Sequence, residues 1–330
     1  MRAFNAGQQA NIPEQERIDF EPTWFKKALS QPGESRRLPF RGRHIHTLHW
    51  KPAAKAPGIV LIHGNGAHAR WFDFIAPLLL PHYHVVALDL PGMGDSDWLP
   101  EYSREIMAEA VIETVRQSGF NGKPALVAHS FGGMVGVVAS DLYSEEIAGS
   151  LICDYIAPPP KFHQEWYGDR ENSPPTRVYE TKEDALQRFR LMPEQPCENE
   201  FIVDYIGERS IRDLSIDDGI IRDMREAEGF TWKFDNNIYD GFVVGADLAE
   251  KWQALKIPLA YMFGGRSHND DTKDFQQPAI AEYVRAARPD VPFYEIPDAR
   301  HHIMLDRPHA FAASIATQME QWRAAGHFDV

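Results

Sequence analysis

Residues 124–143, PALVAHSFGGMVGVVASDLY, join an apolar run, a serine and a glycine-rich apolar stretch. The run 124–130 predicts a buried strand, and the residues after it predict a buried helix. Ser130 lies at the junction, where strand and helix approach closely and small residues are needed; Gly132 and Gly133 supply them on the helix side. The pattern predicts a sharp turn that holds the serine hydroxyl over the sheet edge, as a nucleophile requires. A serine that only caps a buried helix is the alternative.

Similar apolar runs flank this stretch on both sides. Strands are predicted at 44–51, 58–63, 84–90, 149–157, 257–265 and 291–297, with the first at a sheet edge, and helices at 103–119, 275–288 and 308–324. Apolar strands that alternate with helices are typical of a parallel sheet covered on both faces. The sequence therefore predicts an α/β fold.

The alternation stops at Pro158-Pro159-Pro160 and resumes near residue 251. Between these points the chain has charged, helical segments such as 182–190 and aromatic clusters such as 230–235. The expected parts are an N-terminal extension over 1–40, an α/β core over 41–157 and 251–330, and a helical cap inserted over 158–250.

Composition excludes several classes of function. The net charge of −14 over 330 residues argues against binding to nucleic acid or to anionic membranes. Two cysteines, neither in a CxxC pair, disfavour a disulfide framework or a zinc site, and we expect no cofactor and no metal. The histidines at 44–49 alternate along the predicted edge strand, which favours a surface position. Without an apolar leader near the start, a cytoplasmic location is expected.

Four segments resemble the consecutive signature segments of the α/β-hydrolase superfamily. They are IVLIHGNGAHARWFDFIAPLL (59–79), VVALDLPGMGDSD (85–97), LVAHSFGGMVG (126–136) and HHIMLDRPHAF (301–311). They occur in the right order and cover about 45–157 and 255–325. The resemblance implies an α/β-hydrolase fold, with a mostly parallel eight-stranded sheet, helices on both faces, a helical cap after the sixth strand, and a Ser–acid–His triad.

The resemblance also implies the position of the triad histidine, in the loop after the last strand. Two histidines compete there, and register against Pro308 favours His301 over His302. A neutral imidazole at His301 can accept the serine proton and return it to the leaving group. His302 is expected to be a packing neighbour.

The triad acid is where the chain departs from the pattern. The usual acid position, in the turn FGGRSHND, holds Ser267, which cannot stabilise an imidazolium. Asp154, at the end of the strand before the cap, is the favoured substitute, because some branches of the superfamily place the acid there. Asp270 or Asp271 in a longer loop is the second possibility, and Asp298 on the loop of His301 is the third.

The resemblance further implies an oxyanion hole formed by the backbone N–H groups of Asn65 and Phe131. In the predicted cap several aromatic residues can either line a substrate pocket or pin the cap to the core, namely Trp166, Tyr167, Phe189, Trp232 and Phe234. Of these, Trp232 and Phe189 are the predicted substrate-binding residues.

These features predict a serine hydrolase that acts on a small or medium carboxylic ester through an acyl-enzyme, with a small molecule as its partner. Hydrolysis of a carbon–carbon bond or a lactone uses the same triad and is the alternative. A hydrolase-like protein that only binds a ligand is a second alternative, because the usual acid is missing. Ser130 argues against dehalogenase and epoxide hydrolase chemistry, which use an aspartate nucleophile.

Overall fold

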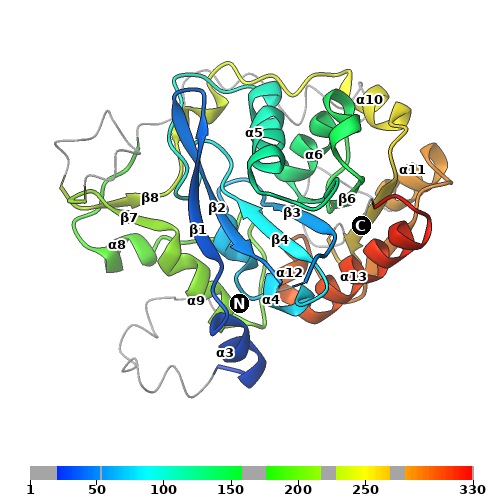
Figure 1. Cartoon of the computed structure of the whole chain (residues 1–330). Helices are drawn as coiled ribbons and strands as arrows, with labels where there is room; N and C mark the ends of the chain where they lie inside the picture. Colours follow the sequence, from blue (N-terminus) through cyan, green and yellow to red (C-terminus); the bar gives the residue numbers. More distant parts are fainter. Residues whose placement is uncertain (1–20, 53, 158–175, 217–227, 268–278, 329–330) are drawn as a thin grey trace.

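The computed structural model describes residues 21–52, 54–157, 176–216, 228–267 and 279–328, and a single eight-stranded sheet forms its centre (Figure 1). The strand order is β1-β2-β4-β3-β5-β6-β9-β10. These strands are β1 (Glu34–Phe40), β2 (Arg43–Trp50), β3 (Gly58–Ile62), β4 (His84–Leu88), β5 (Ala125–His129), β6 (Gly149–Cys153), β9 (Leu259–Gly264) and β10 (Phe293–Ile296). Strand β2 is antiparallel to both neighbours, and all other pairs are parallel. The predicted α/β-hydrolase fold is confirmed.

Strand β1 changes two expectations about the N-terminal part. It lies inside the predicted extension over 1–40, yet its residues 34–40 belong to the sheet, and α3 (Thr23–Leu29) precedes it in the chain. The prediction that 44–51 is an edge strand is wrong, because β1 covers β2 on its outer side. The charges of ESRRLPF concealed this strand, although charged side chains are common on the solvent face of an edge strand.

The histidines of β2 also differ from expectation, since His46 and His49 are buried. His46 has a partner on each ring nitrogen: Asp89 Oδ2 lies 2.6 Å from Nδ1, and Ser35 Oγ lies 2.8 Å from Nε2. His49 is hydrogen-bonded through Nε2 to the hydroxyl of Thr47. A buried polar ring is tolerated when its nitrogens are hydrogen-bonded, which holds for both nitrogens of His46, whereas Nδ1 of His49 has no hydrogen-bond partner in the described part of the chain.

Two hydrophobic cores lie on the two faces of the sheet. In β3, Ile59 and Leu61 face the core that contains α3, α4 and α13, whereas Val60 and Ile62 face the core that contains α5 and α6. Figure 1 shows these two groups of helices on opposite sides of the strands. This alternation within one apolar run is what a parallel sheet covered on both faces requires.

The helices predicted at 103–119, 131–143 and 308–324 are present, the one predicted at 275–288 is described over 279–287, and several short helices of the core were not predicted. The α-helices are α4 (Ala76–Leu79), α5 (Arg104–Gln117), α6 (Phe131–Leu142), α10 (Leu248–Ala254), α11 (Ala279–Ala287), α12 (Ile303–Asp306) and α13 (Pro308–Ala324), and the 3-10 helices are η1 (Ala69–Phe72) and η2 (Ser144–Glu146). In the described part of the chain, no helix has both the length and the apolar character needed to cross a membrane.

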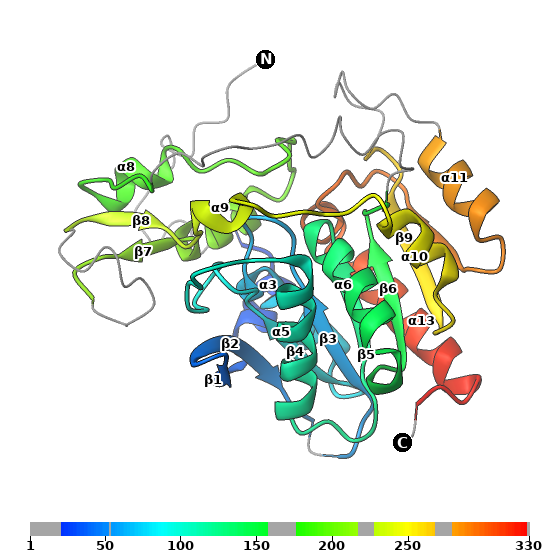
Figure 2. The ribbon, with the colours of Figure 1, turned by 90° about the horizontal axis from the view of Figure 1, so that it is seen from above.

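The described residues between β6 and β9 form a separate group of elements. They comprise α8 (Lys182–Leu186), α9 (Glu200–Arg209), the 3-10 helix η4 (Asn236–Tyr239) and an antiparallel pair, β7 (Ile211–Asp213) with β8 (Phe230–Trp232). Figures 1 and 2 both show α8, α9, β7 and β8 gathered beyond β1 and β2. The stretch is therefore not purely helical, and α10, which packs against α6, begins within the predicted cap.

Candidate active site

Ser130 lies at the sharp turn between β5 and α6. Its backbone has φ 54° and ψ −122°, an unfavourable conformation for a residue with a side chain. The neighbouring glycines permit this turn: a Cβ at Gly132 would lie 2.4 Å from the carbonyl oxygen of His63, and one at Gly133 would lie 2.5 Å from Cβ of Tyr155. The close approach explains why both positions are glycine.

The usual turn around a serine nucleophile has the pattern Gly-x-Ser-x-Gly, and here Ala128 occupies the first glycine position. Gly136 makes room for its methyl group. A Cβ at Gly136 would lie 2.8 Å from the Ala128 methyl carbon. Because Gly136 on α6 has no side chain, the methyl group of the fully buried Ala128 fits between strand and helix. The glycine at 136 therefore compensates for the extra methyl group at 128.

His301 is hydrogen-bonded through both ring nitrogens. Its Nδ1 lies 2.6 Å from Asp154 Oδ2, and its Nε2 lies 2.8 Å from Ser130 Oγ. A carboxylate only accepts, so Nδ1 carries the proton and Nε2 accepts from the serine hydroxyl. The side chain of Asp154 is fully buried and that of His301 is 17% exposed. The structure thus brings Ser130, His301 and Asp154 into one hydrogen-bonded row.

The loop that carries His301 is held from several directions. The carboxylate of Asp306 accepts a hydrogen bond from the backbone N–H of Arg300 at 2.7 Å. The side-chain oxygen of Gln195 accepts from the backbone N–H of His302 at 2.9 Å. The His129 ring donates from Nε2 to the His301 carbonyl oxygen at 2.8 Å. These contacts explain the aspartate shortly after the histidine, because the Asp306 carboxylate anchors the loop.

Asp154 follows β6 directly, with a positive φ of 49°. Its backbone N–H donates to the Met262 carbonyl oxygen at 2.7 Å, which ties it to β9. The carboxylate accepts from the backbone N–H of Gly264 through Oδ1 and from the Ser267 hydroxyl through Oδ2. Ser267, in the usual acid position, therefore contacts the carboxylate that pairs with His301.

The other candidates for acid and base are placed differently. Asp298 is half exposed and forms an ion pair with Arg266. Asp270 and Asp271 lie outside the described residues. His302 is buried, and its Nε2 donates to the Pro193 carbonyl oxygen at 3.2 Å. Burial lowers the pKa of the His302 ring well below its ordinary value.

The loop after β3 approaches the serine closely. A Cβ at Gly64 would lie 3.1 Å from Cβ of Ser130, so only glycine fits there without a shift. The backbone N–H of Leu90 donates to His63 Nε2 at 3.0 Å, which leaves the proton on Nδ1 to donate to the Gly64 carbonyl oxygen at 2.7 Å. The next backbone N–H belongs to Asn65. Within the described chain neither this N–H nor that of Phe131 donates a hydrogen bond.

Aromatic side chains from the stretch before α10 pack against Phe131, the residue after the serine. The ring of Phe131 is 5.7 Å from that of Phe242 and 6.4 Å from that of Tyr239, centroid to centroid. Tyr239 in turn lies 6.3 Å from Phe234. Sequence reasoning named Phe234 but missed Tyr239 and Phe242, because nothing in NNIYDGF shows that this segment returns to α6.

The two predicted substrate-binding aromatics pack within the inserted stretch. The ring centroids of Phe189 and Trp232 are 6.0 Å apart, and Trp232 also contacts Tyr179. A Cβ at Gly207 on α9 would lie 3.1 Å from the Phe189 ring, so this ring packs closely against α9. These contacts join elements of the insertion to one another. Trp166 and Tyr167 lie outside the described residues.

Two side-chain groups in the described chain have the spacing to hold a metal ion. One consists of His46, Asp89 and Asp95, and the other of His129, His301 and His302. In the first group Asp95 already forms an ion pair with the Lys233 ammonium at 2.7 Å. The ammonium therefore supplies the positive charge that a metal ion would otherwise provide.

A family model described as the alpha/beta hydrolase family matches residues 59–314. A 2-hydroxy-6-oxo-6-(2'-aminophenyl)hexa-2,4-dienoic acid hydrolase from Metapseudomonas resinovorans is 35% identical over 98 residues, covering 28% of this chain and 33% of that protein. A pimeloyl-(acyl-carrier protein) methyl ester esterase from Chromobacterium violaceum is 23% identical over 268 residues, covering 81% of this chain and 95% of that protein. The chain thus spans only about a third of the first relative but nearly all of the second.

Solved structures show the same fold. An E-2-(acetamidomethylene)succinate hydrolase has a TM-score of 0.66 at 17% identity, with 87% of this chain and 99% of that chain covered. An esterase from Mycobacterium tuberculosis has a TM-score of 0.63 at 18% identity, with 90% and 97% covered.

Proposed function

The chain belongs to the alpha/beta hydrolase family, and we propose that it is a serine hydrolase that cleaves a small or medium carboxylic ester through an acyl-enzyme. The observation that supports this proposal is the row of hydrogen bonds from Ser130 Oγ through His301 to Asp154, at 2.8 and 2.6 Å. An imidazole oriented by a carboxylate and accepting from a serine hydroxyl is what activates a serine nucleophile.

In the proposed reaction Ser130 Oγ attacks the ester carbonyl carbon while its proton moves to His301 Nε2. Asp154 stabilises the imidazolium that results, and the N–H groups of Asn65 and Phe131 stabilise the oxyanion. The imidazolium then protonates the departing alkoxide, which leaves as an alcohol. Water, deprotonated by His301, attacks the acyl-enzyme, and His301 returns the proton to Ser130 Oγ as the carboxylic acid is released. One ester and one water thus give one acid and one alcohol, and the enzyme is regenerated.

The aromatic group beside the nucleophile suggests the chemistry of the substrate. Phe131 directly follows Ser130, and its ring packs with the rings of Tyr239 and Phe242. We infer that they contact the apolar part of the ester, in place of Phe189 and Trp232. The inserted stretch 158–250 would then act as the cap that carries this wall. The net charge of −14 agrees with a small-molecule substrate rather than a nucleic acid or an anionic membrane.

The test is labelling of Ser130 by a fluorophosphonate probe, followed by turnover of p-nitrophenyl esters of increasing acyl length. We expect wild-type protein and a Ser144→Ala control to label and to hydrolyse the esters, whereas Ser130→Ala does neither. Folded wild-type protein that does not label would favour the alternative of a ligand-binding protein. The chain-length series bounds the acyl pocket.

Hydrolysis of a carbon–carbon bond or a lactone by the same three residues is the second candidate. The relative from Metapseudomonas resinovorans, named as a hydrolase of a dienoic acid, favours it. A protein that labels at Ser130 yet leaves every ester in the series intact would support this candidate.

A further inference from the structure

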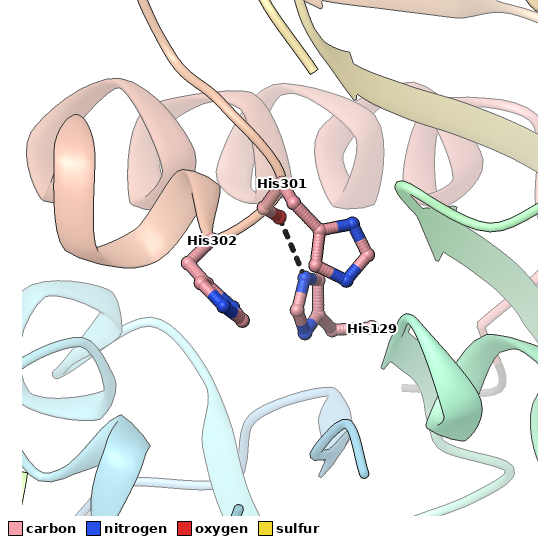
Figure 3. Close-up of side chains that lie close together, drawn as sticks. All are labelled: His129, His301 and His302. Atoms are coloured by element: carbon pink, nitrogen blue, oxygen red, sulfur yellow. Dashed lines mark hydrogen bonds between the residues drawn. The ribbon is translucent and has the colours of Figure 1, made fainter. Parts of the chain in front are cut away.

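Three histidine rings meet beside the proposed nucleophile. His129 ends β5, and His301 and His302 precede α12 (Figure 3). The ring centroid of His301 is 4.9 Å from that of His129 and 5.0 Å from that of His302. One nitrogen of each ring lies within 4.8 Å of a nitrogen on each of the other two.

Hydrogen bonds hold each ring in a neutral tautomer with one lone pair. His129 donates from Nε2 to the carbonyl oxygen of His301, and His302 donates from Nε2 to that of Pro193. His301 donates from Nδ1 to Asp154. In each ring the other nitrogen is therefore unprotonated. The Nδ1 of His302 is buried and has no hydrogen-bond partner in the described structure, although a buried polar atom is normally satisfied.

We propose that His129, His301 and His302 form an inhibitory site for a divalent transition-metal ion of borderline softness, with Zn²⁺ as the probe. Imidazole nitrogens suit such ions, and three protein ligands leave a fourth position open. A histidine that binds zinc commonly donates its other N–H to a carboxylate or a backbone carbonyl, and all three rings here already do so. The buried carboxylate of Asp154 would offset part of the ion's charge.

The rearrangement needed for coordination is small. Zinc–nitrogen bonds of about 2.0–2.1 Å in a tetrahedral site place the nitrogens roughly 3.3 Å apart. Ring nitrogens that begin no more than 4.8 Å apart must therefore approach by up to about 1.5 Å. A pivot of the partly exposed His301 ring about its hydrogen bond to Asp154 can supply part of this movement, because the bond from Ser130 to Nε2 is given up when the ion binds.

Binding would block the proposed reaction through His301. The ion takes the Nε2 lone pair, and the hydrogen bond from Ser130 breaks, so the hydroxyl loses its proton acceptor. No electron is transferred, and a chelator restores the free imidazole. The inhibition rests on the proposed function, whereas the binding of the ion does not.

The first test measures binding alone. Zn²⁺ is titrated by calorimetry into full-length wild-type protein, His129→Gln, His302→Gln and the control His82→Gln, after thermal melts show that each is folded. Glutamine keeps an N–H donor for the carbonyl at each site and removes the imidazole lone pair. We expect each of the two cluster variants to lose at least tenfold in affinity at one site, and His82→Gln, an exposed position, to match wild type.

The second test measures inhibition as the loss of fluorophosphonate labelling at Ser130 when Zn²⁺ is added. We expect wild type and His82→Gln to be protected and EDTA to reverse this, Mg²⁺ to have no effect, and both cluster variants to need at least tenfold more Zn²⁺. Folded cluster variants that bind Zn²⁺ and are protected like wild type would overturn the proposal. If neither variant folds, a zinc-soaked crystal of the wild-type protein decides. Anomalous density among the three rings supports the site, and anomalous density that occurs only at other positions refutes it. Binding at the cluster in a protein that never labels would refute the proposed hydrolase while leaving the metal site intact.

Discussion

Strands β6 and β9 are neighbours in the sheet, yet their ends contribute different groups to the same site. The end of β6 supplies the Asp154 carboxylate, and the turn after β9 supplies the Ser267 hydroxyl. The family resemblance places the acid in the turn after β9, at the position that Ser267 occupies. Here the Ser267 hydroxyl donates to Asp154 Oδ2, the oxygen that also accepts from His301. Groups from both strand ends therefore meet at one carboxylate oxygen beside the imidazole, and we expect that either strand end can provide the carboxylate.

The strongest test of this comparison removes the carboxylate from β6. We expect Asp154→Asn to lower kcat for a p-nitrophenyl ester by about 10⁴-fold, because the amide favours the wrong imidazole tautomer. Circular dichroism and the melting temperature should stay near wild type. Asp298→Asn is the matched control and should change kcat little, since that carboxylate pairs with Arg266.

Near-normal turnover by Asp154→Asn would show that β6 does not supply the acid. The same assay on Asp270→Asn and Asp271→Asn would then identify the residue that does.

The next test moves the carboxylate to β9. We expect Asp154→Asn/Ser267→Asp to regain roughly a hundredfold of the lost turnover, because an aspartate at 267 returns a negative charge to the imidazole. The control Asp154→Asn/Ser267→Asn has the same size without the charge and should stay inactive. Equal rates for the two double variants would mean that the ends of β6 and β9 are not interchangeable.

A smaller effect is expected when only the hydroxyl is removed. Ser267→Ala deletes one hydrogen bond to the carboxylate, and a hydrogen bond to a charged group is worth about 1.5 kcal/mol or more, so kcat should fall about tenfold. Ser267→Thr keeps the hydroxyl and should recover most of the rate. A Ser267→Ala protein as active as wild type would limit the role of the β9 turn to packing.

The smallest effect on turnover is expected from substitution of His129, a neighbour of the His301 ring. This substitution should instead change how the stability of the protein depends on pH. Burial lowers the pKa of His129 to about 3 from an ordinary value near 6.5. The unfolded chain therefore binds more protons than the folded chain between these values, and stability is lost as the pH falls from 6.5 towards 3. His49 and His68, with pKa values lowered by burial to about 3, add to the loss.

Denaturant titrations at pH 7.5 and pH 5 measure this dependence. His129→Gln should lose less stability over the interval than wild type, since one titrating group is gone. An unchanged difference between the two pH values would show that His129 does not contribute.

Local sequence was sufficient to predict those elements whose pattern lies within a single segment of the chain. The strand, serine and two glycines at 125–133 predict the turn because the motif lies within one segment, although the atoms that demand glycine, in His63 and Tyr155, belong to other parts of the chain. The helices at 104–117, 131–142 and 308–324 agree with their predicted ranges for the same reason. Their apolar periodicity is a property of the segment. The catalytic roles assigned to Ser130, His301 and Asp154 stay predictions until they are tested.

Tertiary structure decided whatever depends on which distant segments become neighbours. The sequence alone offered several aspartates as the triad acid, with Asp154 favoured. Only the position of β6 between β5 and β9 brings the Asp154 carboxylate within hydrogen-bonding distance of the His301 ring. The same holds for β1 at the sheet edge, for the burial of His46 against Asp89, and for Tyr239 and Phe242 beside Phe131. A pattern within a segment records which face is apolar. It carries no information on the distances across the sheet, which follow from the packing of the whole chain.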